Sequence, residues 1–293
     1  MAISFFKKLG DMFKDKRVDV AERFQLLREA VSGTMSSFYM ALDRTTGKTV
    51  GLKILDPEKC SAFEARFKGL NKPSEGEIAL LLKHPRIVDT LEAGQTKDGK
   101  QYVVMEFVEG QGLHAILKNE NAYLDGKRLN LFRQMTEAID AVHKAGFIHR
   151  DVCPRNFIVS SDASALKLID FGLTLPMQRE YMLPGNRTGT PLYLAPEIVR
   201  RKPTDQRVDL FSLGVTAYQM WTFTFPWPSS DATGTGALQH DSRDPTPIIE
   251  LRPKIHRAIA KTIMACLEAD PNKRPESAEN VLKMLRNATK DTL

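Results

Sequence analysis

The sequence predicts an α+β protein of two lobes, in which a small antiparallel sheet with one main helix precedes a larger, mainly helical part. The chain has 293 residues, enough for one large domain or for two lobes. Short strand-like runs fill the part before about residue 110, and helical periodicity dominates the part after it. We therefore expect an N-terminal extension (1–20), a small lobe (21–110) and a larger lobe (111–293).

The composition excludes several classes of protein. Hydrophobic residues make up 42% of the chain and charged residues 27%, which excludes a disordered chain, a collagen or a disulfide mini-protein. The net charge of +6 is mild, so we expect no nucleic acid partner. The three cysteines lack zinc or disulfide spacing and fit buried thiols in a reducing compartment. No apolar run fits a membrane span or a signal peptide, so we expect a cytoplasmic protein.

Residues 1–17 differ from the rest of the chain. They hold five basic and two acidic residues, so half of the net charge lies there. Their apolar residues are spaced as on one face of a helix, which predicts a basic amphipathic helix. Such a helix docks on the body of the protein, contacts a partner, or lies peripherally on a membrane, and the pattern does not decide among these. The apolar residues are Ile3, Phe5, Phe6, Leu9, Met12 and Phe13.

The small lobe is expected to hold about five strands and one main helix. A helical stretch at Cys60–Lys83 is broken near Pro73, because proline interrupts helices. Turn residues at Thr45–Lys48 and Lys97–Lys100 separate strand-like runs. The expected strands are Phe24–Val31, Phe38–Arg44, Thr49–Asp56, Ile87–Ala93 and Gln101–Val108.

The larger lobe is expected to be mainly helical. An apolar stripe from Leu129 to Val142 predicts a helix that ends at Gly146. Ser229–Pro247 is rich in Ser, Thr, Gly and Asp and predicts a mobile surface loop. The other expected helices are Val208–Trp221, Ile255–Glu268 and Glu276–Leu285.

Four motifs carry chemically important residues. They are Val50–Lys53, which ends in a lysine within an apolar run, His149–Asn156, Asp170–Gly172 and Gly189–Glu197. In this order and at these separations they resemble the signature set of the protein kinase superfamily, in particular compact bacterial members of the eukaryotic-like serine/threonine type. The resemblance spans about 23–285 and implies a two-lobed protein-kinase-like fold with ATP as the phosphoryl donor.

The resemblance assigns a role to the lysine and to a carboxylate partner. Lys53 would hold the α- and β-phosphates, and an apolar strand requires a counter-charge for it. Glu75 is the expected partner, because it precedes His84 by the family spacing. Glu77 and Glu64 are the weaker alternatives.

The resemblance also assigns the residues that act on the substrate and the metal. Asp151 would orient the substrate hydroxyl and accept its proton. Asp170 and Asn156 would bind Mg²⁺ through oxygen atoms, with Mn²⁺ as an alternative ion. Asp209 would anchor the catalytic loop, and Glu197 would form a structural pair with Arg274.

The resemblance assigns nucleotide binding to two further segments. Met105 would control the depth of the adenine pocket, while Glu106 and Val108 offer backbone hydrogen bonds. The glycine-rich loop keeps only Gly33 of its usual pattern, and Val31 stiffens its entry. We therefore expect weaker or slower nucleotide handling.

The catalytic loop departs from the family pattern. Serine/threonine kinases usually have lysine where this chain has Cys153. Arg155 stands where receptor-type tyrosine kinases often place an arginine, and it would supply the missing cation. A redox role for Cys153 is the weaker alternative. Gly189–Pro191 and Tyr193 nevertheless resemble the serine/threonine type of substrate loop.

Regulation by phosphorylation is a further expectation. Arg150 is the family's usual receiver of a loop phosphate, and Thr188 and Tyr181 are candidate acceptors. Thr190 is assigned to substrate positioning instead.

The favoured function is an ATP-dependent serine/threonine protein kinase with a protein substrate. One alternative is a pseudokinase that acts as a nucleotide-binding or scaffold module. A small-molecule phosphotransferase is disfavoured, because Gly189–Glu197 resembles a platform for peptide substrates. The sequence does not indicate the substrate, the stimulus or the oligomeric state.

Overall fold

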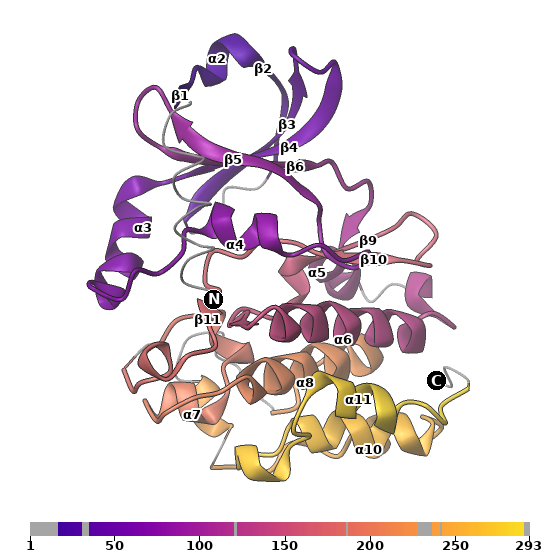
Figure 1. The fold of residues 1–293 in the computed structure, drawn as a ribbon. Helices are drawn as coiled ribbons and strands as arrows, with labels where there is room; N and C mark the ends of the chain where they lie inside the picture. Colours follow the sequence, from indigo (N-terminus) through magenta and orange to yellow (C-terminus); the bar gives the residue numbers. More distant parts are fainter. Residues whose placement is uncertain are drawn as a thin grey trace. The chain divides into compact units, whose positions relative to one another are not determined.

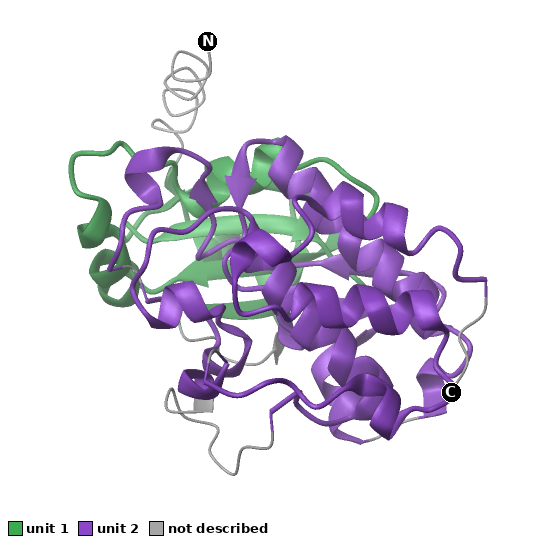
Figure 2. Ribbon diagram, turned by 90° about the horizontal axis from the view of Figure 1, so that it is seen from below, with its two compact units in different colours: residues 1–108 green, residues 109–293 purple. Residues whose placement is uncertain are grey.

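The structure is a computed structural model that describes residues 17–30, 35–119, 122–185, 187–227, 236–240 and 242–289. It divides into two compact units, unit 1 (1–108) and unit 2 (109–293), which Figure 2 shows in different colours. The expected N-terminal helix, apart from Arg17, and the loop residues Val31 and Gly33 lie outside the described residues.

Unit 1 is built on a six-stranded sheet with the order β1-β5-β6-β4-β3-β2 (Figure 1). All its pairs are antiparallel except β1 with β5, which is parallel. Arg17, which was placed in the predicted helix, instead pairs with Gln95 in β1. A two-residue strand has no periodicity from which it could be predicted. The strands are β1 (Arg17–Val18), β2 (Phe24–Ala30), β3 (Ser36–Asp43), β4 (Lys48–Leu55), β5 (Thr90–Thr96) and β6 (Gln101–Glu106).

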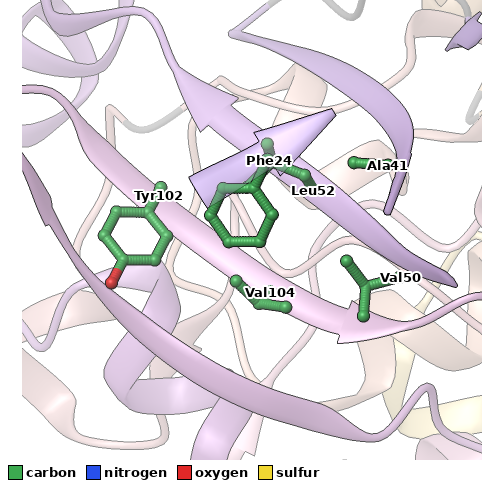
Figure 3. Packing of buried hydrophobic residues seen from close by; sticks show 6 residues of the cluster. All are labelled: Phe24, Ala41, Val50, Leu52, Tyr102 and Val104. Atoms are coloured by element: carbon green, nitrogen blue, oxygen red, sulfur yellow. The ribbon is translucent and has the colours of Figure 1, made fainter. Parts of the chain in front are cut away.

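One face of this sheet forms a hydrophobic cluster (Figure 3). Side chains alternate between the faces of a strand, so residues on the other face include Lys53. The cluster therefore packs on one face of the sheet and stabilises the strands, one of which carries Lys53 on the other face. Its buried members are Phe24, Ala41, Val50, Leu52, Tyr102 and Val104.

The expected helical stretch of unit 1 is divided at the proline. Pro73 ends the connecting segment, and Ser74 begins the next helix with a capping box, in which Ser74 and Glu77 bond each other's backbone N–H. The helices are α2 (Val20–Arg23), α3 (Pro57–Glu64), the 3₁₀ turn η1 (Ala65–Phe67) and α4 (Glu75–Leu81).

Unit 2 is mainly helical, and its long helix α8 is buried along almost its whole length. Only Arg207 among the residues of α8 is not buried, so this helix is surrounded by packed neighbours. The helices are α5 (Leu113–Lys118), α6 (Arg128–Lys144), α7 (Pro196–Val199), α8 (Arg207–Thr222), α9 (Ile248–Leu251), α10 (Arg257–Cys266) and α11 (Ala278–Met284).

Shorter elements complete unit 2. None of the described helices combines the length and apolar character that crossing a membrane requires. The strands are β7 (Gln111–Gly112), β8 (Phe147–Ile148), β9 (Phe157–Val159), β10 (Leu166–Leu168) and β11 (Leu175–Pro176). The 3₁₀ turns are η2 (Ala122–Leu124), η3 (Pro154–Asn156), η4 (Arg179–Tyr181), η5 (Pro191–Tyr193), η6 (Gly236–Gln239) and η7 (Pro271–Lys273).

The expectation of a surface loop at Ser229–Pro247 is wrong for its middle part. Ala237 is buried, and His240 is only 3% exposed. The ring of His240 stacks on Trp227 at a centroid distance of 4.3 Å and bonds the carbonyl oxygen of Leu194 through Nδ1. The polar composition of the loop did not indicate these contacts, because they depend on Trp227 and Leu194, which lie outside it.

Candidate active site

Lys53 and Glu75 form a buried ion pair within unit 1. Lys53 on β4 is 5% exposed and Glu75 at the start of α4 is 8% exposed, and Nζ lies 2.5 Å from Oε1. A lysine removed from water requires such a counter-charge. Of the weaker candidates, Glu77 caps α4 and Glu64 is exposed at the end of α3.

The close approach of α4 to the sheet brings Glu75 to Lys53. A Cβ atom on Gly76 would lie 2.5 Å from Cβ of Ala93 in β5 and 3.6 Å from Cγ2 of Val103 in β6. Only a residue without a side chain fits there, so Gly76 sets the distance between helix and sheet. The glutamate beside it is thereby held within reach of the lysine.

Some of the expected nucleotide-binding residues in and after β6 already form hydrogen bonds or packing contacts within unit 1. Met105 is buried and pairs with Gly51 of β4. The N–H of Glu106 donates to the carbonyl oxygen of Asp89 at 2.9 Å, and Oε1 of Glu106 accepts the N–H of Asp89 at 2.7 Å. Since that N–H is engaged, a bond from Glu106 to a base would have to use its carbonyl oxygen. Val108 follows β6 and is half-buried.

Asp151 lies at the centre of a hydrogen-bond network in unit 2. Its Oδ1 accepts the N–H of Thr190 at 2.9 Å and the hydroxyl of Thr190 at 2.7 Å. Its Oδ2 accepts Nδ2 of Asn156 at 3.0 Å, and the same Nδ2 donates to the carbonyl oxygen of Asp151 at 2.7 Å. These bonds fix the carboxylate in one orientation and tie it to the segment around Thr190.

The loop before Asp151 is held by a carboxylate of α8. Asp209 is fully buried and accepts the N–H groups of His149 at 2.8 Å and Arg150 at 2.7 Å. Nε2 of His143 lies 2.9 Å from Oδ2 of Asp209. Burial raises the pKa of Asp209, but the bonds from His143 and the backbone outweigh it, so the pKa is lowered. Arg150 adopts a left-handed φ of 67°, a costly conformation that Asp209 stabilises.

Asp170 is also held in a left-handed conformation. Its φ is 69°, and its Oδ1 accepts the N–H of Gly172 at 2.9 Å, a local bond that makes this conformation accessible to aspartate. The next residue, Phe171, is buried and packs edge to face on His149 at 5.6 Å. The N–H of Ile169 donates to the carbonyl oxygen of Asn156 at 2.8 Å. Asp170 and Asn156 thus belong to loops that are tied to each other.

The donor atoms of Asn156 and Asp170 suit Mg²⁺. The amide nitrogen of Asn156 is directed to Asp151, so its metal-binding atom would be the amide oxygen. Mg²⁺ prefers oxygen ligands and commonly uses one or two side chains together with substrate phosphates. The described residues contain no cluster of three or more His, Cys, Asp or Glu suited to a metal.

The positions of Cys153 and Arg155 oppose the redox alternative. Cys153 is 1% exposed, and burial raises the pKa of its thiol to about 12. A reactive cysteine needs an accessible thiolate at neutral pH, which this environment disfavours. Arg155 on η3 is exposed. Of the two positions, only Arg155 offers a cation to a phosphate.

The regulatory candidates differ in burial. Arg150 is buried, which lowers its pKa to about 10, and its Nη1 lies 3.4 Å from the hydroxyl of Thr204. Thr188 is half-buried. Tyr181 is only 3% exposed, which opposes its expected role as a phosphate acceptor in this conformation. Its position on η4 directs the ring inward, a feature that the sequence pattern did not indicate.

A second buried ion pair, in unit 2, joins α7 to the residue that follows η7. Arg274 donates from Nη1 and Nη2 to Glu197 at 2.7 and 2.8 Å, and its guanidinium stacks on Phe211 at 4.9 Å.

Sequence reasoning missed two other residues that position the site. His143 directly follows Val142, the last residue of the apolar stripe, and Gly51 is an isolated glycine within a strand, a signal of close packing.

Comparison with known proteins agrees with this arrangement. The model of the protein kinase domain matches residues 24–285. The serine/threonine-protein kinase pkn3 of Myxococcus xanthus is 32% identical over 89% of this chain and 49% of its own length. A probable serine/threonine-protein kinase of Clostridium perfringens is 32% identical over 93% of this chain and 39% of its own length.

The serine/threonine-protein kinase pkn2 of Myxococcus xanthus is 31% identical over 91% of this chain and 32% of its own length. The chain thus spans about half or less of the length of these relatives. The match to the domain model covers the sheet of unit 1 from β2 onward and the helices of unit 2 through α11. The chain therefore belongs to the protein kinase family.

Proposed function

We propose that the chain is an ATP-dependent serine/threonine protein kinase. The observation that carries this proposal is the network in which Asp151 accepts bonds from Thr190 and Asn156. It holds a carboxylate beside a segment of the type that positions a peptide hydroxyl. The three relatives described above are named as serine/threonine-protein kinases, one of them as a probable one, which supports the same function.

The proposed reaction moves one phosphoryl group. The substrate hydroxyl oxygen forms a bond to the γ-phosphorus of ATP, and the bond to the β–γ bridging oxygen breaks. The electron pair of that bond leaves with ADP, and the hydroxyl proton passes to Asp151. Asp151 also orients the hydroxyl, because Thr190 and Asn156 prevent its carboxylate from turning.

The phosphates are assigned to cations of the chain and to the metal. Lys53, kept in place by Glu75, would hold the α- and β-phosphates. Asp170 and Asn156 would hold Mg²⁺, which when bound offsets the charge of the phosphates. Mn²⁺ takes the same oxygen ligands and is the alternative ion. Arg155 would supply the cation that Cys153 does not.

The test is phosphoryl transfer from labelled ATP with Mg²⁺, to the chain itself and to generic protein substrates. Asp151→Asn and Asp170→Ala are the matched variants, since the first removes the proton acceptor and the second a metal ligand. We expect transfer by the wild type and a loss of about 10²-fold or more in each variant. Nucleotide binding by the wild type without transfer above the variants would instead support a scaffold.

Regulation by phosphorylation remains part of the proposal. Thr188 is the favoured acceptor, since Tyr181 is buried, and Arg150 is the favoured receiver of its phosphate. Mass spectrometry of the chain after incubation with ATP would locate the phosphate. Thr188→Ala should then abolish any increase in rate that follows this incubation.

The expected extension 1–20 is too long, because Arg17 and Val18 pair with β5 in the sheet of unit 1. We further propose that residues 1–16 act as an extension separate from the two lobes, and that the chain is cytoplasmic. The basic and apolar residues of 1–17 support a contact with a partner protein or a membrane surface. Co-sedimentation with anionic liposomes, with and without residues 1–16, tests the membrane contact. Equal sedimentation of the two chains would exclude it.

A further inference from the structure

The register of the sheet places a set of side chains on the face that carries Lys53. Phe38 of β3 pairs with Lys53 of β4, and Gly51 of β4 pairs with Met105 of β6. Cross-strand partners point to the same face, and so do residues two apart on one strand. Phe38, Gly51, Lys53 and Met105 therefore share one face, opposite the hydrophobic cluster shown in Figure 3.

Gly51 is the feature of this face that requires explanation. A glycine inside a strand weakens it and commonly marks a place where another group approaches closely. A Cβ atom on Gly51 would lie 2.9 Å from Cζ of Phe38 and 2.9 Å from Cγ of Met105. The ring of Phe38 and the side chain of Met105 thus occupy the space that any larger residue would need.

Phe38 and Gly51 depart from the kinase pattern in opposite directions. The pattern has valine after the glycine-rich loop and alanine two residues before the strand lysine. This chain has the larger Phe38 at the first position and the smaller Gly51 at the second. The contact between them indicates that one change compensates the other, as volume-conserving substitutions in a packed region do.

We propose that Phe38, accommodated by Gly51, is a specificity-determining residue whose ring forms the platform on which a purine base stacks. The proposal rests on the proposed function, since Lys53 marks this face as the one that receives the nucleotide. Phe38 is half-buried, so the residues around it do not enclose its side chain completely. Met105 is buried beside Gly51 and limits how far a base extends along β6.

The chemistry of the face favours a flat base at this position over a phosphate or a sugar. An aromatic ring gives no hydrogen bond to a phosphate but stacks well on another ring. Lys53, two residues from Gly51, supplies the cation for the phosphates farther along the same strand. The two ends of a nucleotide are thus assigned to different residues of β3 and β4.

The test measures the binding of adenosine and of inorganic tripolyphosphate with Mg²⁺ to the full chain. The variants are Phe38→Val, Gly51→Ala and the double variant Phe38→Val/Gly51→Ala, which restores the family pattern. We expect Phe38→Val to weaken adenosine binding by about fivefold or more, through the lost stacking. Gly51→Ala should weaken it by about tenfold, because its Cβ displaces the ring.

If the two substitutions acted independently, the double variant would bind adenosine about fiftyfold more weakly than wild type, the product of the two single effects. Compensation predicts instead that it binds within about threefold of Phe38→Val alone. Tripolyphosphate binding should stay within about twofold of wild type in all three variants, because Lys53 and Glu75 are unchanged. Tyr39→Val is the matched control, since it removes a half-buried ring from the same strand but from the opposite face. It should leave adenosine binding unchanged.

The outcomes separate this inference from the proposed function. Wild-type transfer with unaltered adenosine binding in Phe38→Val and Gly51→Ala would overturn the inference and leave the function intact. Additive effects in the double variant would overturn the compensation of the two residues. A wild type that neither binds adenosine nor transfers phosphate would overturn both. Thermal unfolding identifies variants that do not fold, and if Gly51→Ala is one, Phe38→Val and the double variant carry the test.

Discussion

Burial determines the reactivity of each of the three cysteines. Burial raises the pKa of Cys60 to about 11, and it raises the pKa values of Cys153 and Cys266 to about 12. At about pH 8 the thiolate fraction of each is then well below one percent, and thiolate is the reactive form. We expect iodoacetamide to modify the folded chain far more slowly than the chain unfolded in guanidinium.

Mass spectrometry of the alkylated peptides measures this rate for each cysteine separately. Cys60 is half-buried and serves as the internal comparison for the two buried thiols. If iodoacetamide modified Cys153 in the folded chain as fast as in the unfolded chain, the thiol would be reactive and a redox role would be supported.

Arg155 and Cys153 give a second prediction at the scale of single residues. Arg155→Ala should lower phosphoryl transfer by about 10²-fold, the usual cost of removing a group that stabilises transition-state charge. Cys153→Ser keeps a small group beside Thr190 and should change transfer by less than about threefold. Steady-state rates at saturating ATP test both variants. Equal rates for Arg155→Ala and wild type would remove the arginine from the proposed mechanism.

The sequence predicted the pairing of Lys53 with Glu75, because Glu75 followed from its distance to His84 and the structure contains the ion pair. The catalytic roles of Asp151 and Asp170, which also belong to motifs of fixed spacing, stay predictions. The contact of Phe38 with Gly51 depends on the pairing of β3 with β4, which a linear pattern does not specify. Likewise, burial of a side chain such as Tyr181 depends on residues distant in sequence.

At the scale of elements, the packing of α4 on β5 gives a prediction with a definite sign. Helix propensity alone predicts that Gly76→Ala stabilises the chain by about 1 kcal/mol. The 2.5 Å contact with Ala93 predicts the reverse, a destabilisation of about 1–3 kcal/mol from overpacking. Transfer should fall as well, because a displaced α4 moves Glu75 away from Lys53.

Urea unfolding and transfer rates measure the two effects of Gly76→Ala. Ala93→Gly removes the opposing methyl group, so the double variant Gly76→Ala/Ala93→Gly should recover part of both losses. A single variant more stable than wild type would show that the helix does not press on the strand as described.

The anchoring of the catalytic loop by α8 predicts a dependence of stability on pH. The pKa of Asp209 is lowered in the folded chain, and an unfolded aspartate has a pKa of about 3.9. Its stabilising contribution is therefore fully present above about pH 4 and is lost as the pH falls below that value. The free energy of unfolding of wild type and Asp209→Asn should differ most near neutral pH.

Urea unfolding of both proteins at several pH values between about 3 and 7 checks this. The difference between them should shrink toward the acid end, where Asp209 takes up a proton in both states. A difference that stays constant over this range would show that the charge of Asp209 contributes nothing.

Elements with a long apolar pattern were predicted, and short ones were not. The stripe of α6 and the break at Pro73 follow directly from sequence. β1 and α2 are too short to show a period, and they form because β5 and β2 lie beside them. The burial of His240, directly after η6, depends on Trp227 and Leu194, which no pattern within the loop reveals.

At the scale of the whole molecule, the two tryptophans report on one unit only. Trp221 and Trp227 are the only tryptophans of the chain, and both are buried in unit 2. Glu197→Gln breaks a buried ion pair of that unit and should destabilise it by about 3–5 kcal/mol. The urea midpoint of tryptophan fluorescence should fall accordingly.

Far-UV circular dichroism of Glu197→Gln reports on both units and extends this test. Coincident fluorescence and dichroism curves would indicate that the two units unfold together. A second dichroism step at the wild-type midpoint would indicate that unit 1 unfolds by itself. An unchanged fluorescence midpoint would contradict the stabilising role of the pair with Arg274.

The sequence also predicted that strands dominate the first part of the chain and helices the second. The order of short runs before about residue 110 and long stripes after it suffices for the α+β class. The parallel pairing of β1 could not be predicted, since antiparallel hairpins dominate the rest of the sheet.

The position of β1 makes the edge of the sheet an attachment point for a tether. Arg17 and Val18 are held beside Gln95 and Thr96 of β5, so residues 1–16 are attached to the fold at that edge. Sixteen residues reach about 55 Å when fully extended and about 24 Å when helical. Anything that these residues bind is therefore confined to a small volume around β5, at an effective concentration that their length determines.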